Sequence, residues 1–547
     1  MKLKQYISLL LVLLSAGMTS SCTDWLDEQP KDKQSELQQF ATKEGFQAAV
    51  NGIYNRMSGS SLYGSTLSYS MIDLLGQRYT VEQASEESYY KYLRALTEWN
   101  YSDETVIATL GSTWGEAYQT IMNINVILEN LEKDAAEQHT LPQTEYKMLK
   151  GEMLAARAML HFDMLRLFGP IYSKHPEERG VPYNQSTKTE ILPILTAEDV
   201  LSNYILRDLT EAEKLLLDSD PVITEGPRAV YDEITMDNSM RYRQLRLNYY
   251  ATVLLTARAY LWKGDYTNAL TEAKKLTDDP KVRTFFPKVN PGTLLGNSSD
   301  PDRMFSTESL FGFYNADRKL IYNYTFGGED TGKRLLIPRP NYVKALLFNG
   351  ETQDYRCQSQ WDNGTTLDGT PSDRFTKFKE ITDNQQKDDT EDIDGTAALR
   401  KQKFYATFCS LIKLSEAYYI AAEAMGNSTS PEYNLTAAWN YLNTIRADRG
   451  IPAKSGNESQ LTDLITKEYI REFIGEGQIF FYFKRLNKGF DNDYNGRQEM
   501  KVMTAPEVEI FPGWVIPAEY SYKDDATDEE KEKRFVLPLP KNELDNR

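Results

Sequence analysis

Apolar residues recur at helical spacing in several parts of the chain, and the clearest pair of stripes lies between Leu247 and Leu276. The two stripes are Tyr250, Val253, Leu254, Ala257 and Leu261, and then Tyr266, Ala269, Leu270, Ala273 and Leu276. Steps of three and four residues place each set on one face of a helix. The sequence Lys263-Gly264-Asp265 separates the stripes, so this stretch predicts an antiparallel helical hairpin.

Small residues mark the expected seam of this hairpin. Ala257, Ala269 and Ala273 would let the two helices approach closely. Together with Gly264 and Pro280, their order resembles a tetratricopeptide repeat, a unit of about 34 residues. A single hairpin cannot bury its own apolar face, so we expect partner hairpins elsewhere in the chain.

Three further pairs of stripes follow the same plan. They lie at 46–53 with 114–131, at 149–167 with 201–216, and at 411–425 with 435–445. The sequence Thr196 to Asp199 has the form of a helix N-terminal capping box, and one more helix is expected from about Leu461 to Leu486. Segments rich in Gly, Pro, Asn and Asp interrupt the spacing and predict loops and short strands.

These patterns predict a mainly α fold of about four tetratricopeptide-like hairpin pairs with loop-rich insertions and a few short strands. We expect one domain over 22–547, with the helical scaffold at 42–281 and 404–486. The insertions are expected at 58–102, 282–402 and 490–536. Binding residues lie more often on such loops than on the repeats that carry them.

The first residues predict a signal peptide over 1–21. Lys2 and Lys4 precede an apolar run, and small residues precede Cys22, which resembles a bacterial lipoprotein signal. Cys22 would then be acylated and become the first residue of the mature protein, although Thr19 stands where Leu is usual. The alternative is an ordinary secreted protein in which Cys22 has no special role. No other stretch is apolar for long enough to cross a membrane.

Composition excludes several classes of function. The net charge of −18 over 547 residues argues against nucleic acid as a partner, because phosphates are bound by Lys and Arg. With 3 His and 3 Cys, a metal site built on these residues is not expected. The sequence from Asp491 to Gly496 resembles the start of a Ca²⁺ loop, but Val502 stands where the bidentate Glu belongs, so a polar turn is favoured. We therefore expect no cofactor and no metal.

Two remaining features concern reactivity. Cys357 and Cys409 could form a disulfide or stay as free thiols, and the sequence leaves this open. No nucleophile motif and no glycine-rich phosphate loop is present, and His161 is expected to be packed within its helix. Catalysis therefore has little support.

Short motifs from Cys22 to Leu544 resemble, in their order, those of the SusD/RagB-like outer-membrane lipoproteins of Bacteroidetes. The matching stretches are Cys22–Pro30, Ala155–Gly169, Leu206–Ala212, Leu414–Ala424, Tyr441–Arg446, Glu472–Arg485 and Leu537–Leu544. The chain departs from the family at Phe481-Tyr482-Phe483, where a sequence of the Trp-Phe-Asp type is common.

This resemblance implies a cell-surface, lipid-anchored outer-membrane protein that is not an enzyme. Such a protein captures a nutrient, commonly an oligosaccharide, and hands it to a SusC-like, TonB-dependent transporter. One alternative is a peptide-binding member of the same family. A second is an all-helical surface glycoside hydrolase.

Aromatic residues in the insertions are the candidate ligand-binding residues. Sugar rings present apolar C–H faces that stack on exposed aromatic rings, while amide and Arg groups bind the hydroxyls. Trp99, Asn100 and Tyr101 offer both chemistries, and starch-binding members of the family have ligand-contacting Trp residues in the same insertion. Further candidates are Tyr314, Tyr322, Tyr324 and Trp361 with Asp362-Asn363. The alternative is that each ring packs beneath its own loop.

Overall fold

The computed structural model describes most of the chain from residue 36 onward. The described ranges are 36–81, 88–188, 190–228, 240–295, 301–327, 336–338, 343–365, 371–379, 407–489, 507–511, 514–517 and 527–545. The signal peptide, Cys22 and the turn beginning at Asp491 lie outside these residues. Within them, no helix combines the length and the apolar character needed to cross a membrane.

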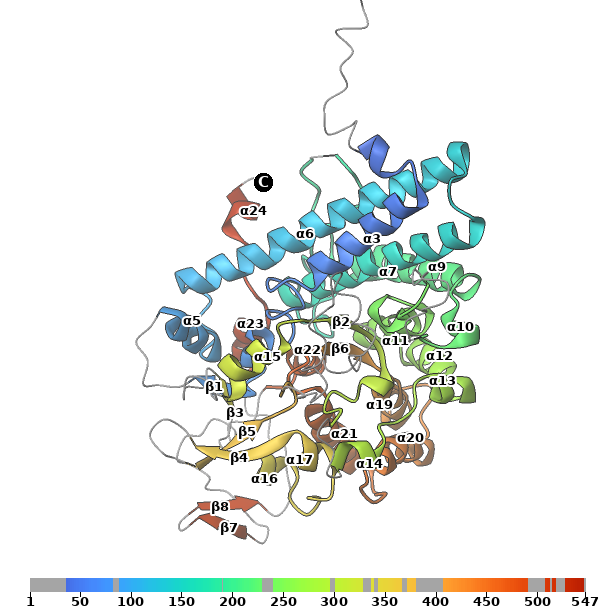
Figure 1. Ribbon diagram of the computed structural model, residues 1–547. Helices are drawn as coiled ribbons and strands as arrows, with labels where there is room; N and C mark the ends of the chain where they lie inside the picture. Colours follow the sequence, from blue (N-terminus) through green and yellow to red (C-terminus); the bar gives the residue numbers. More distant parts are fainter. Residues whose placement is uncertain are drawn as a thin grey trace, which may run out of the picture.

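Four pairs of helices form a scaffold that follows the chain. The pairs are α3 (Lys43–Met57) with α6 (Glu104–Lys133), α7 (Gln143–Phe168) with α9 (Leu206–Leu217), α11 (Tyr249–Lys263) with α12 (Tyr266–Thr277), and α19 (Leu414–Gly426) with α20 (Leu435–Asp448). Each pair packs on the next, and α21 (Glu458–Phe473) extends the stack beyond α19. The helices run in an arc from α3 and α6 at the top of Figure 1 to α20 and α21 below. The expected mainly α, tetratricopeptide-like architecture is confirmed.

The hairpin of α11 and α12 has the geometry that its sequence predicts. Gly264 adopts φ +80° directly after α11, and its N–H donates to the Leu261 carbonyl. This left-handed conformation suits glycine, which has no Cβ, and it ends the helix. Asp265 then caps α12 by accepting the N–H of Asn268. Ala257, Ala269 and Ala273 are fully buried at the seam.

Short helical elements and paired strands connect these helices. The helical elements are α4 (Met71–Leu75), α5 (Ser88–Thr97), η2 (Asp134–Gln138), α8 (Ala197–Asp199), η3 (Val200–Ile205), α10 (Val222–Glu225), η4 (Arg243–Leu245), α13 (Pro280–Phe285), α14 (Pro291–Leu295), η5 (Ser306–Glu308), α15 (Arg318–Ile321), η6 (Tyr322–Gly327), α16 (Val343–Leu347), α17 (Tyr355–Ser359), α22 (Ile479–Arg485), α23 (Asp528–Phe535) and α24 (Lys541–Asp545). The strands in the described residues pair antiparallel in twos: β1 (Tyr79–Val81) with β3 (Leu336–Pro338), β2 (Ser309–Tyr314) with β6 (Phe408–Lys413), β4 (Trp361–Thr365) with β5 (Pro371–Phe375), and β7 (Glu507–Phe511) with β8 (Trp514–Pro517). Thr196 caps α8 by accepting the Asp199 N–H, which is the first of the two hydrogen bonds that make up a capping box.

Two insertions that are far apart in the sequence join into one layer. Strand β1 of the first insertion pairs with β3 of the second, with Thr80 opposite Ile337. Behind this pair, buried aromatic rings from both insertions contact one another: Tyr69, Tyr79, Phe326, Phe375 and Phe378. We call the described residues of 58–102 and 301–379 the insertion layer. Figure 1 shows its strands β1, β3, β4 and β5 at the side of the helical arc, and β2 nearer the centre, beside β6. The segment 58–102 is more helical than expected, because it contains the ten-residue helix α5.

The expected single helix from Leu461 to Leu486 is instead two helices, α21 and α22. Gly475 and Gly477 between them adopt φ +80° and +69°. Their N–H groups donate to the buried carboxylate of Asp73 in α4, at 2.5 and 3.2 Å. The continuous apolar pattern hides this break, because residues on both sides of the turn are buried.

A buried network of charges fastens the insertion layer to the scaffold. Its cations are Arg356, Lys377, Lys413, Arg446, Arg449 and Arg471, and its anions are Glu308, Glu351, Asp354, Glu468, Glu472 and Glu476. Burial alone would raise the pKa of Glu468, but Arg356 and Arg471 outweigh it and lower the value to about 2. Six cations therefore face six carboxylates, which avoids leaving an uncompensated charge in the interior.

Candidate functional site

Trp99 lies at a corner between α5 and α6 and is held on several sides. Its backbone is left-handed, with φ +52°, which is uncommon for a residue with a side chain. The indole N–H donates to the Leu75 carbonyl at 3.2 Å. The Arg534 guanidinium of α23 lies 4.6 Å from the ring centre, within the range of a cation–π contact. The ring is thus partly buried and fixed in orientation.

The two residues after Trp99 complete this corner. Asn100 is exposed, and its side-chain carbonyl accepts the N–H of Ser102, a bond that does not use the amide NH₂. The Tyr101 hydroxyl donates to the Arg534 carbonyl at 2.6 Å. The corner therefore offers a fixed aromatic ring beside an exposed amide, a combination that suits a sugar ring and its hydroxyls.

The other aromatic candidates divide into exposed and buried rings. Tyr314, at the end of β2, is 44% exposed, and Tyr324 in η6 is 50% exposed. Tyr322 is fully buried, and Trp361 is 2% exposed and packs against Phe375. For the candidates Tyr322 and Trp361 the alternative holds, in which the ring packs inside the protein, because both side chains are buried in the interior of the insertion layer.

A groove of ligand size lies between the first half of α6 and the end of the chain. Its volume is about 410 Å³, within the range of about 300–1,000 Å³ that is usual for ligand pockets. The lining residues are Ile107, Ala108, Gly111, Ser112, Trp114, Gly115, Pro540, Lys541 and Glu543. A Cβ added at Gly111 or Gly115 would meet no atom within 4 Å, so these glycines border open space.

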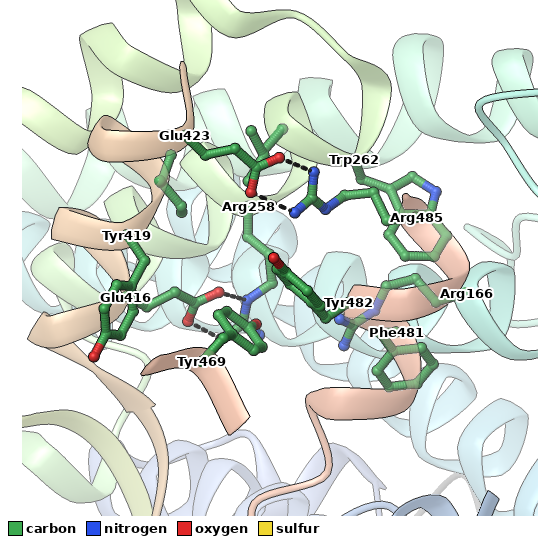
Figure 2. Close-up of a pocket in the computed structure, with 12 residues that line it drawn as sticks. Arg166, Arg258, Trp262, Glu416, Tyr419, Glu423, Tyr469, Phe481, Tyr482 and Arg485 are labelled. Atoms are coloured by element: carbon green, nitrogen blue, oxygen red, sulfur yellow. Dashed lines mark hydrogen bonds and ion pairs between the residues drawn. The ribbon is translucent and has the colours of Figure 1, made fainter. Parts of the chain in front are cut away.

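A second cavity, shown in Figure 2, lies among α7, α11, α19, α21 and α22. Arg258 binds Glu416 through two hydrogen bonds of 2.7 and 2.6 Å, and Arg485 binds Glu423 at 2.5 and 2.7 Å. The enclosed volume is about 30 Å³, far below the size of a sugar ring. These arginines therefore join helices and do not form a saccharide site.

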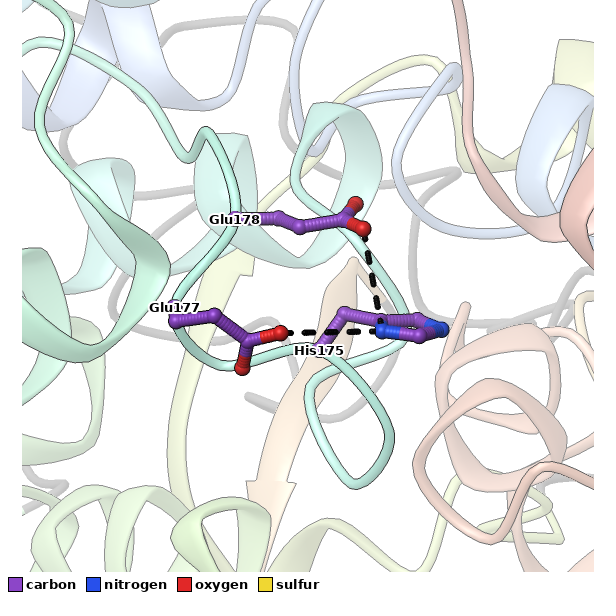
Figure 3. A group of neighbouring side chains, drawn as sticks. All are labelled: His175, Glu177 and Glu178. Carbon is purple, nitrogen blue, oxygen red and sulfur yellow. Dashed lines mark ion pairs between the residues drawn. The ribbon is translucent and has the colours of Figure 1, made fainter.

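Among the described residues, the only group of candidate metal ligands is formed by His175, Glu177 and Glu178 on an exposed loop (Figure 3). The His175 Nδ1 atom lies 3.8 Å from Glu177 and 3.6 Å from Glu178. These side chains are 43%, 72% and 58% exposed. This exposure gives the group the character of a solvated loop.

The candidate reactive residues are held in unreactive states. His161 is fully buried; its Nδ1 bonds the Arg157 carbonyl, and its Nε2 accepts the Asn184 N–H, both at 2.9 Å. Burial lowers the pKa of His161 to about 3, so the ring is neutral at pH 7. Cys357 and Cys409 are both free thiols, and burial raises each pKa to about 11. The question of a disulfide is thereby answered: the two residues do not pair in this structure.

The sequence patterns did not predict two features of the structure that could contact a ligand. The groove beside α6 brings together residues from opposite ends of the chain, although the exposed small residues at Gly111 and Gly115 are a local signal of it. The patterns also missed Arg303 and Arg374, two half-buried arginines of the insertion layer. No periodic pattern distinguishes these from the many arginines that form ion pairs.

Comparisons with known proteins point to one family. A family described as "Starch-binding associating with outer membrane" matches residues 24–251, and the SusD family matches residues 392–547. SusD-like protein P38 of Formosa agariphila is 25% identical, over 94% of this chain and 96% of its own length. A SusD superfamily protein of Bacteroides vulgatus has a similar structure, with a TM-score of 0.63 at 21% identity, covering 92% of this chain and 96% of its own. A protein described as laminarin-binding and SusD-like has a TM-score of 0.57 at 16% identity, covering 92% and 97%.

Proposed function

Because the chain is a SusD/RagB-like protein, we propose that it binds an oligosaccharide at the cell surface and passes it to a SusC-like, TonB-dependent outer-membrane transporter. The observation that carries this proposal is the insertion layer. Strand pairing joins two distant insertions, and their surface presents the Trp99 corner, Tyr314 and Tyr324. Loops placed on a rigid scaffold are the usual position of binding residues.

The chemistry of these residues suits binding without turnover. Exposed Tyr rings can stack on the C–H faces of sugar rings, and the Asn100 amide can bond to hydroxyls. The relatives support a saccharide ligand, since one matching family is described as starch-binding and one structural neighbour as laminarin-binding. The charged residues of the helical interior are bound to one another and stabilise the fold.

The membrane attachment in this proposal is a lipid on Cys22. The signal peptide would be removed before Cys22, and the residues up to 35 would connect the anchor to the first described helix. An acyl chain contributes about 0.8 kcal/mol per buried CH₂, and stable anchoring takes more than one chain. The proposal needs no metal ion and no cofactor.

The deciding experiment is a binding screen of the protein lacking residues 1–22 against polysaccharides and peptides. Saturable binding to a polysaccharide, with no release of reducing ends, is the expected result. Binding to peptides alone would show that the nutrient is a peptide and not a saccharide. Release of reducing ends in proportion to protein concentration would identify a glycoside hydrolase instead.

A further inference from the structure

Buried arginines in this protein are in general bonded to carboxylates. Of the ten arginines buried in the described residues, Arg78 and Arg318 donate to backbone carbonyls. The other eight have a carboxylate within ion-pair distance: Arg157, Arg166, Arg243, Arg258, Arg356, Arg446, Arg449 and Arg471. A guanidinium stays charged at any ordinary pH, so a half-buried one without a partner is costly. Exceptions to the pattern therefore call for an explanation.

Arg303 is one exception. Its Nε donates to the Ser359 carbonyl at 3.1 Å, while its Nη1 is buried and has no hydrogen-bond partner. No carboxylate among the described residues lies within ion-pair distance of it. Burial lowers the pKa of Arg303, and the more distant Asp362 carboxylate partly opposes this effect. The guanidinium thus keeps one buried donor without a partner, while the residue as a whole is only half-buried and remains partly accessible to solvent.

Arg374 is the second exception. It lies on β5 directly opposite Asp362 on β4, so both side chains project from the same face of this hairpin. Its Nε is buried and has no hydrogen-bond partner, and within the described residues the side chain forms no ion pair. A Cβ at Gly364 would lie 3.4 Å from this Nε, so the Arg374 side chain lies along the glycine.

The exposed Asp362 relates to both arginines: its carboxylate acts electrostatically on Arg303, and it lies opposite Arg374 in the β4–β5 pair. Element η6, which carries the exposed Tyr324, packs against β5. The exposed Tyr324 and Arg374 thus lie on neighbouring elements of one layer. A guanidinium presents paired N–H donors that fit a carboxylate or a sulfate.

We propose that Arg303 and Arg374 bind anionic groups of the ligand, and that the ligand is an acidic polysaccharide. The anionic group is a carboxylate of a uronic acid or a sulfate ester, since both offer the oxygen acceptors that these guanidinium groups lack. This inference rests on the proposed function and adds the chemical class of the saccharide to it. The local positive charge offsets the repulsion expected from a chain whose net charge is −18.

The test compares charged and neutral forms of the same polymers. The first pair of probes is polygalacturonate and its carboxyl-reduced form, which tests recognition of carboxylates. The second pair is dextran sulfate and dextran, which tests recognition of sulfate esters. The variant is Arg303→Gln with Arg374→Gln. The matched control is Lys174→Gln with Lys281→Gln, which removes the same charge from two exposed lysines.

We expect the unaltered protein to prefer at least one charged polymer to its neutral form. The arginine variant should bind that polymer about ten- to a hundredfold more weakly, since hydrogen bonds to charged groups contribute about 1.5–3 kcal/mol. The lysine control should keep its affinity. Binding should also weaken as salt is added.

Three results would overturn the inference. They are equal affinity for charged and neutral forms, unchanged affinity in the arginine variant, and no binding to either charged polymer. In the first case the proposed oligosaccharide-binding function survives, whereas binding to peptides alone would remove both proposals. If the double variant does not fold, Arg374→Gln alone gives the same comparison, because that side chain is only half-buried.

Discussion

The Asp73 carboxylate accepts the backbone N–H of Gly475 at 2.5 Å, across 402 residues of chain. This contact joins α4 of the first insertion to the turn between α21 and α22. Burial raises the pKa of Asp73 to about 7, while the Gly475 hydrogen bond and the charge of Lys377 oppose the rise. The two glycine N–H groups of the turn therefore obtain their hydrogen-bond acceptor from the first insertion.

Asp73→Ala should destabilise the protein. It leaves the N–H groups of Gly475 and Gly477 buried without an acceptor, at a cost of about 1–3 kcal/mol each. Asp317→Ala, at an exposed position, is the control and should leave Tm unchanged. Thermal unfolding measures both variants, and equal Tm values would show that this contact does not hold the turn.

Ala269→Trp should disrupt the hairpin of α11 and α12. Ala269 is fully buried at the seam, and overpacking of a core position typically costs about 1–3 kcal/mol, occasionally more. Thr271→Trp places the same side chain on the exposed face of α12 and should be tolerated. We expect a lower Tm for Ala269→Trp than for Thr271→Trp. The same Tm for both variants would contradict the position of Ala269 at the helix seam.

His161 should make stability depend on pH. The folded protein keeps the ring neutral down to a pKa of about 3, whereas the unfolded chain binds a proton below the ordinary value of 6.5. The unfolded state thus binds the extra proton between these values, so stability is lost as pH falls from 6.5 toward 3. The free energy of unfolding, measured with urea, should fall with pH between about 6 and 4 more steeply in the unaltered protein than in His161→Gln. The difference in slope should be about 1.4 kcal/mol per pH unit. Parallel pH profiles would contradict the neutral, buried ring.

Trp99→Ala should weaken saccharide binding without unfolding the protein. Loss of an aromatic stacking surface costs about 1–3 kcal/mol per base in nucleic-acid complexes, and a comparable loss of affinity is expected here. If Trp99 serves the core alone, the change should instead cost about 3–5 kcal/mol of stability. Tyr433→Ala removes a 45% exposed ring outside the insertion layer and should affect neither quantity. Intact affinity for the ligand found in the screen would remove Trp99 from the site.

Cys22→Ala should abolish acylation, because the sulfur that carries the lipid is lost. The variant is expected in the soluble fraction or as the unprocessed precursor. Fractionation of cells, with metabolic labelling by a fatty acid, measures this. A labelled variant that stays in the outer membrane would exclude Cys22 as the anchor.

Periodicity predicted the helical scaffold well, because a buried helix face repeats every three to four residues whatever it packs against. It could not predict the turn at Gly475, since residues on both sides are buried and the deciding partner is Asp73. It also could not tell that Trp361 and Tyr322 are buried while Tyr314 and Tyr324 are exposed. Those outcomes depend on a layer assembled from distant segments, and irregular loops carry no repeat that reports burial.

The same limit applies to charges. Arg449 pairs with Glu308, 141 residues away, whereas Arg303 and Arg374 have no such partner among the residues that the structure describes. In the sequence all three are arginines in polar surroundings. Their distinction, and with it the proposed acidic ligand, comes only from the folded arrangement.

The buried charge network limits how recognition loops can be exchanged between relatives. The insertion supplies Glu308, Glu351, Asp354, Arg356 and Lys377, which carry one negative charge in excess, and the scaffold side carries one positive charge in excess. A transplanted loop that lacked this excess would leave a cation stranded in the interior. Loop chimaeras should therefore fold only when these buried positions travel with the graft, while the exposed positions between them remain free to acquire new ligand specificity.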